Sequence, residues 1–271
     1  EQKILSEAAV DYPSAKRHLT VNPWVVTAAV MMATFMEILD TTVVNVSIPH
    51  IAGNLAATVE EGTWVVTSYL VANAIVLPMS GWLAKYMGRK RLLLTCVAGF
   101  TVTSLCCGLA TSLPMLIFFR VLQGIGGGGL QPSEQAILAD TFPPARRGMA
   151  FAVYGIAVVM APAIGPTLGG WLTDTYSWRW VFLINVPVGL LAFAGCYALL
   201  RDPAYLTAQR LELKKAPFHF DSIGLSLLVI VMVSWEVMLS KGQEWDWLDD
   251  PFWRMQTLIT FFPLTIEPQP V

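Results

Sequence analysis

Long apolar stretches separated by short polar segments dominate this chain. Each stretch is close to or above the roughly 20 residues that a helix needs to cross a bilayer. Most of them lack the polar face that a helix on a soluble domain carries. The sequence therefore predicts an all-α membrane protein with seven spans, at roughly 23–47, 62–83, 92–110, 115–139, 149–173, 180–200 and 222–240.

The segments between and beyond these stretches define the expected domains. After the seventh span, Phe252 to Ile266 offers only 15 apolar-rich residues, interrupted by Arg254 and Pro263. That is too short for a comfortable span, so we expect a truncated chain. The expected parts are a cytoplasmic N-terminal segment at 1–22, a six-helix bundle at 23–200, a cytoplasmic linker at 201–221, the seventh helix at 222–240, and an outer loop with an incomplete eighth helix at 241–271.

Composition and charge agree with a membrane protein. The chain is 55% hydrophobic and 13% charged, whereas a soluble domain is about one quarter charged. Thirteen of the 17 Lys and Arg residues fall on the side of the N-terminus, so the positive-inside rule places that terminus in the cytoplasm. Net charge is −2 with no basic patch, which excludes a nucleic-acid partner.

Two similar segments suggest an internal repeat. Gly81-Trp82-Leu83-Ala84-Lys85 ends the second span, and Gly170-Trp171-Leu172-Thr173-Asp174 ends the fifth. Two units of three spans face opposite sides of the membrane, as in the inverted 3+3 repeats of secondary transporters. We therefore expect this arrangement in the six-helix bundle.

Two isolated charges lie at the same expected depth. Asp40 is about eight residues from the end of the first span, and Arg120 is about eight residues from the start of the fourth. At 1.5 Å per residue, both lie roughly 12 Å from the outer boundary. Glu37 and Gln123 are each one turn deeper on the same helix faces. Spans one and four are thus expected to present a polar layer to a common cavity.

Two interpretations of this layer remain open. One is a structural ion pair that locks two helices together. The other is proton coupling, because two acids that share one cation cannot ionise independently. In that hypothesis Asp40 stays charged against Arg120, while either Glu37 or Asp40 binds and releases a proton. Glu134, near the inner end of span four, is ambiguous because its side chain could simply reach the interface.

Glycine and proline are concentrated in the fifth span. Proline removes helix hydrogen bonds, and glycine permits close backbone approach. The span could act as a gate, pack tightly against a partner, or carry a structural kink. The residues concerned are Gly155, Pro162, Gly165, Pro166, Gly169 and Gly170.

Motifs for catalysis or cofactors are not recognised. Gly124 to Gly129 fits G-x-G-x-x-G, but no strand precedes it, so a nucleotide loop is rejected. The sequence has no H-E-x-x-H, P-loop or C-x-x-C pattern. We expect neither an enzyme nor a cofactor or metal site.

Five motifs, in order along the chain, carry a resemblance to a known family. Leu39 to Pro49, Gly81 to Arg91, Arg120-x-x-Gln123-Gly124, Gly165-Pro166-x-x-Gly169-Gly170 and Trp178 to Pro187 resemble the motifs of the major facilitator superfamily. The first and last are similar to those of its 14-span drug:proton antiporters, the EmrB-like multidrug exporters. The resemblance extends to about residue 250.

The resemblance implies proton-coupled efflux of lipophilic or cationic drugs by alternating access, in the cell inner membrane. It implies that Asp40 and Arg120 serve proton coupling and that the Gly165-Pro166 helix belongs to an exporter. The family's loop motif usually has an acid where this chain has Lys85, and Asp140 could substitute as a partner for Arg89 or Lys90. The loop motif residues are Gly81, Lys85, Gly88, Arg89, Lys90 and Arg91.

The family also implies partners beyond lipid, protons and drug. EmrB-like pumps work with a periplasmic adaptor and an outer-membrane channel, and they have 14 spans, so a C-terminal half would be missing here. Two alternatives stay open: a non-transporting fragment of an interrupted gene, and a seven-helix receptor. The receptor is disfavoured by the cytoplasmic N-terminus and by a seventh span without a central lysine.

Overall fold

The computed structural model describes residues 22–200 and 222–241, and all secondary structure there is helical. The expected segments 1–22, apart from its last residue, 201–221 and most of 241–271 lie outside the described residues. The helices are α2 (Pro23–Asn54), α3 (Val59–Met87), α4 (Arg89–Gly108), α5 (Leu113–Gly127), α6 (Leu130–Thr141), α7 (Pro144–Thr175), α8 (Arg179–Leu183), α9 (Asn185–Leu199) and α11 (Ser222–Lys241).

Six helical segments in the described part are long and apolar enough to cross a membrane. Two of the six are made of consecutive helices, α5 with α6 and α8 with α9. Helix α11 coincides with the predicted seventh span, but its apolar part is the shorter stretch Ser226–Leu239. Helices α2, α3 and α7 extend several residues beyond the first, second and fifth predicted spans. Polar residues continue each helix after its apolar run ends.

Local sequence explains where several helices begin. Asn22 caps α2 by accepting a hydrogen bond from the Trp24 amide, and Pro23 occupies the first turn, where no amide donor is needed. Thr58 and Glu61 form a capping box at the start of α3. Gly88 joins α3 to α4 with φ 94°, a conformation that favours glycine.

The glycine run of the fourth span permits close helix packing. A Cβ on Gly126 would lie 2.9 Å from the Phe100 amide nitrogen of α4, and one on Gly128 would lie 2.7 Å from the Asn73 carbonyl oxygen of α3. Small residues at such positions let membrane helices approach closely. The run therefore positions the span between α3 and α4, and the helix breaks between α5 and α6 at Gly128 and Gly129.

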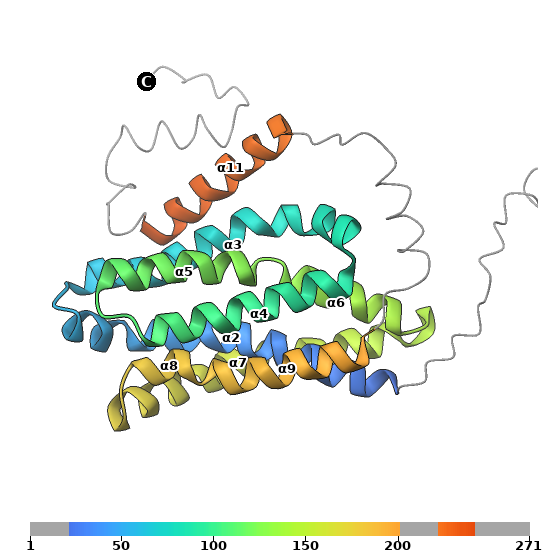
Figure 1. Ribbon diagram of the computed structural model, residues 1–271, viewed down its shortest axis with the longest axis horizontal. Helices are drawn as coiled ribbons and strands as arrows, with labels where there is room; N and C mark the ends of the chain where they lie inside the picture. The colour runs from blue at the N-terminus through green and yellow to red at the C-terminus, as the bar shows by residue number, and fades with distance from the viewer. Residues whose placement is uncertain (1–21, 201–221, 242–271) are drawn as a thin grey trace, which may run out of the picture.

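Helix α2 holds the bundle together. It packs against α3, α6, α7, α8 and α9, and α5 packs between α3 and α4. Figure 1 shows α2 running alongside α7 and α9, with α11 lying across α3. Many large apolar side chains on the outside of the bundle are exposed, as expected for helices whose solvent is lipid.

Candidate functional site: buried charges inside the helical bundle

Four charged side chains are buried in the described part of the chain. They are the acids Glu37, Asp40 and Glu134 and the cation Arg120. Charges inside a membrane-spanning bundle are costly unless they are paired. Their arrangement is therefore the place to look for function.

Asp40 and Arg120 form a buried ion pair. The Arg120 Nη1 lies 2.5 Å from the Asp40 Oδ2, and both side chains are 0% exposed. Arg120 also donates from Nε to the Val65 carbonyl at 2.9 Å and from Nη1 to the Gln123 Oε1 at 2.9 Å. Its Nη2 has no partner. Arg120 of α5 is thus linked to α2 through Asp40 and to α3 through the Val65 carbonyl.

Amide side chains complete the shell around Asp40. Asn185 of α9 donates to the Asp40 Oδ1 at 2.7 Å, and Gln123 donates to the same oxygen at 3.3 Å. Asn185 also donates to the Ser104 hydroxyl of α4 at 3.1 Å. The sequence analysis did not identify the contact between Asn185 and Asp40. The residues that precede Asn185, Phe182-Leu183-Ile184, are apolar and gave no indication of this contact.

Aromatic rings cover the guanidinium of Arg120. The ring of Tyr69 lies 4.2 Å from the Arg120 Cζ, and the ring of Phe182 lies 5.7 Å from it. Cation–π contacts of this kind are worth up to about 2 kcal/mol when they are shielded from water. They help the bundle retain a cation that cannot lose its proton.

Glu37 does not share Arg120, contrary to the sequence-based expectation. Its Oε1 accepts from the Asn73 Nδ2 at 3.2 Å and from the Tyr69 hydroxyl at 3.5 Å, and its Oε2 has no partner. The reason is geometric. The guanidinium is directed to Asp40, Gln123 and the Val65 carbonyl, while Glu37 faces α3.

Glu134 lies inside the bundle and does not reach an interface. It is 0% exposed. Its Oε2 accepts hydrogen bonds from the Thr34 hydroxyl of α2 and, at 3.4 Å, from the Tyr154 hydroxyl of α7, whereas its Oε1 has no partner. A signal was present in the sequence, because Thr34, Glu37 and Asp40 recur every three residues on one face of α2.

The loop motif holds neighbouring helices at one end of the bundle. Arg89 forms an ion pair with Asp140 and donates to the Ala136 carbonyl at 3.0 Å, so α4 is tied to α6. Lys90 donates to the carbonyls of Tyr197 and Leu200, both at 2.7 Å. Asp140 therefore contacts Arg89, one of the two partners that the sequence suggested. Of the other motif residues, Gly88 joins the helices, and Gly81, Lys85 and Arg91 are exposed.

The fifth span packs its glycine face on α2. A Cβ on Gly169 would lie 2.9 Å from the Val43 carbonyl oxygen, and Gly165 packs against Thr42. Gly155 and Gly170 have open space around them. Pro162 and Pro166 are exposed and lie within the continuous helix α7. Among the alternatives left open by the sequence, close packing describes Gly165 and Gly169.

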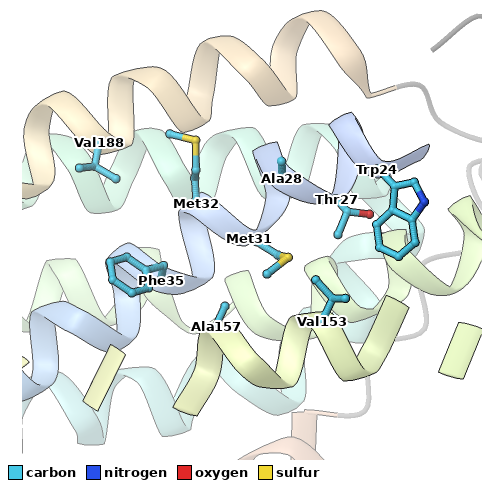
Figure 2. Close-up of a pocket in the computed structure, with 9 residues that line it drawn as sticks. All are labelled: Trp24, Thr27, Ala28, Met31, Met32, Phe35, Val153, Ala157 and Val188. Atoms are coloured by element: carbon cyan, nitrogen blue, oxygen red, sulfur yellow. The ribbon is translucent and has the colours of Figure 1, made fainter. Parts of the chain in front are cut away.

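An apolar groove lies beside this core. It has a volume of about 450 Å³ and is formed by α2, α7 and α9 (Figure 2). Val153 lines it, while the next residue, Tyr154, bonds to Glu134 on the buried side of α7. The groove carries no charged side chain, so it suits a lipophilic surface. Its lining residues are Trp24, Thr27, Ala28, Met31, Met32, Phe35, Val153, Ala157 and Val188.

Within the described ranges, no group of three or more His, Cys, Asp or Glu side chains could hold a metal ion. The four cysteines are free thiols. The charged side chains buried in the core of the described part are carboxyl groups and a guanidinium, which form one ion pair.

Comparisons with known proteins place the chain in a family. The model of the Major Facilitator Superfamily matches residues 30–266. The multidrug export protein EmrB of Escherichia coli (strain K12) is 45% identical over 223 residues, covering 82% of this chain and 42% of that protein. The fatty acid resistance protein FarB of Neisseria gonorrhoeae is 40% identical over 241 residues, covering 88% and 45%. The chain thus spans less than half the length of these relatives.

A solved transporter shares the fold. The inward open conformation of the xylose transporter XylE from E. coli aligns with a TM-score of 0.60 over 78% of this chain and 56% of that one, at 17% identity. At this identity the likeness concerns the fold alone. With a family match over most of its length and a bundle like that of a known transporter, the chain belongs to the Major Facilitator Superfamily.

Proposed function

We propose that this chain is the proton-coupling half of a multidrug exporter that exchanges protons for lipophilic or cationic drugs. The observation that carries the proposal is the buried pair of Asp40 and Arg120 with an unpaired acid, Glu37, one turn away. The names of the relatives, which refer to multidrug export and fatty acid resistance, support a lipophilic substrate. The apolar groove of Figure 2 agrees with that class.

Glu37 is the better candidate for the proton carrier. Asp40 is paired with a guanidinium and accepts hydrogen bonds from two amide donors. Glu37 has only neutral donors, on one oxygen, and it is buried. A buried carboxylate without a cation is costly, so it takes up a proton unless a charge or water approaches it. Glu37 can therefore change its protonation without breaking the ion pair.

Alternating access would couple this proton to drug movement. Protons from outside neutralise the acid site, and drug arriving from the cytoplasm or the inner leaflet favours proton release inward. Each charge that crosses uncompensated uses about 2.3 kcal/mol per 100 mV of membrane potential. Helix α7, which packs its glycine face on α2, is the element whose movement would open or close the site.

The proposal includes an orientation and partners. The distribution of basic side chains supports a cytoplasmic N-terminus, and the family supports a location in the inner membrane. A second half, a periplasmic adaptor and an outer-membrane channel complete the proposed export machinery, by analogy with the family.

Everted membrane vesicles from cells that express the complete open reading frame test this function. Addition of a lipophilic cationic drug should release protons from energised vesicles, and the release should be lost in Glu37→Gln and Asp40→Asn. The matched control is Glu60→Gln, which removes an exposed carboxyl from the first turn of α3. Full drug-induced proton release in both core variants would refute the proposal.

A further inference from the structure

The buried core has more acids than one cation can neutralise. Of the four buried charged side chains in residues 22–200, three are acids and only Arg120 is a cation. Arg120 is paired with Asp40. If all four groups were ionised, the core would carry two unbalanced negative charges, and it becomes neutral when two protons are bound.

Glu37 and Glu134 are the acids left without a cation, and they have the same local design. In each, one carboxyl oxygen accepts hydrogen bonds from two neutral side chains, and the other oxygen has no partner. A protonated carboxyl has one accepting oxygen and one O–H group. The oxygen without a partner is therefore the one available to carry a proton.

The surroundings of Glu134 offer no countercharge. The titratable groups that face it are Glu37 of α2, Tyr154 of α7, Cys96 of α4 and Cys196 of α9. From α3, Tyr69 and Asn73 bond to Glu37. Arg89 of α4 is a basic residue that contacts α6, but it is paired with Asp140, further along that helix than Glu134. An ionised Glu134 would thus be repelled by Glu37 and stabilised only by two hydroxyl groups.

We infer that Glu134 is a second proton-binding site and that the bundle holds two exchangeable protons, at Glu37 and Glu134. This inference rests on the proposed function. Drug is not the ligand of Glu134, because its carboxyl is fully buried and does not line the apolar groove. A proton fits the space that a drug cation does not.

The helix geometry gives the two sites an order. Thr34, which bonds to Glu134, lies about one turn from Glu37 and two from Asp40 on one face of α2, at 1.5 Å per residue. In the proposed orientation Glu134 is therefore on the cytoplasmic side of Glu37. Tyr154 reaches Glu134 from α7, the helix whose glycines pack on α2. Movement of α7 relative to α2 would withdraw a hydroxyl donor from Glu134 and alter its hold on the proton.

Infrared spectroscopy of the purified protein in lipid, in sodium-free buffer at neutral pH, tests the site directly. A protonated carboxyl has a C=O stretching band that a carboxylate lacks. Glu134→Gln should remove one such band, Glu37→Gln should remove a different one, and Glu60→Gln should remove neither. Spectra of Glu134→Gln and wild type that are identical in this region would overturn the inference.

A second variant keeps the test decisive if Glu134→Gln does not fold. Tyr154→Phe removes one hydroxyl donor and leaves the carboxyl, so it should shift the frequency of the carboxyl band that persists in Glu37→Gln and not the band that Glu37→Gln removes. An unshifted band would count against the assignment.

Proton counting separates this inference from the proposed function. The number of protons released per drug molecule bound should be halved in Glu134→Gln relative to wild type. An unchanged number overturns the two-proton inference while antiport stands. If wild type releases no protons on drug binding, the proposed function fails, and the infrared result alone decides whether Glu134 binds a proton.

Discussion

Neutralising Asp40 should destabilise the bundle more than neutralising its partner. Asp40→Asn leaves the Arg120 guanidinium buried, charged and without an anion, and arginine cannot be deprotonated. The new amide would also direct a donor toward Arg120 or toward the Gln123 and Asn185 amides, which already donate to this site. Removing one partner of a buried pair costs about 3–5 kcal/mol. That is more than half of the total stability of a domain at the low end of the usual range, about 5–15 kcal/mol.

The reverse change is milder, and the double variant should cost less than the two single changes added together. Arg120→Gln leaves Asp40 able to take up a proton, so we expect a loss of about 2–3 kcal/mol, including the cation–π contact with Tyr69. In the double variant neither charge is stranded. Its cost should fall below the sum of the single costs by about 2–3 kcal/mol, at the upper end of couplings between contacting residues.

The free energy of unfolding in mixed micelles measures all three variants. Asp174→Asn is the matched control, because it makes the same substitution at an exposed side chain, 70% accessible, and should change stability by less than about 0.5 kcal/mol. If Asp40→Asn costs less than about 1 kcal/mol, or if the double variant costs the full sum, the buried-pair reasoning is wrong.

Two further predictions concern packing and the loop motif. Gly169→Ala should cost about 1–3 kcal/mol, since its Cβ would lie 2.9 Å from the Val43 carbonyl oxygen, whereas Gly170→Ala, with open space around it, should be nearly neutral; equal unfolding free energies for the two would contradict the packing. Arg89→Gln should cost about 1–3 kcal/mol, because Arg89 and Asp140 are only 22% and 21% exposed and Asp140 would lose its charged partner, and it should lower the rate of the proposed drug transport. An unchanged rate would show that the α4–α6 tie has no part in the transport cycle.

The level of the ion pair and its two members could be predicted from sequence, but the surroundings of Glu37 could not. Distance along two helices of known rise brought Asp40 and Arg120 to one depth, and they are in contact. The expected sharing of Arg120 between two acids was wrong, because the rotation of α2 about its axis turns Glu37 toward Asn73 and Tyr69 of α3. One-dimensional spacing places residues on a face, whereas the neighbours of that face depend on packing.

The same distinction applies to the glycine run and to Glu134. The sequence excluded a nucleotide loop at 124–129, but it did not predict the division of the fourth span at Gly128 and Gly129, where Gly128 packs against Asn73 and Val76 of α3. The burial of Glu134 depends on Thr34 and Tyr154, which lie 100 and 20 residues away along the chain. No local pattern contains contacts of that separation.

By itself, the sequence determined the helical membrane class, the approximate spans and the presence of a few intramembrane charges, because apolar length and isolated charge are properties of each segment alone. Only the tertiary structure decided which side chains surround Glu37 and Glu134, and that these two acids are left without a cation. The physical reason is that a salt bridge needs two side chains within about 4 Å, and that proximity is set by helix rotation and by glycine contacts between distant segments.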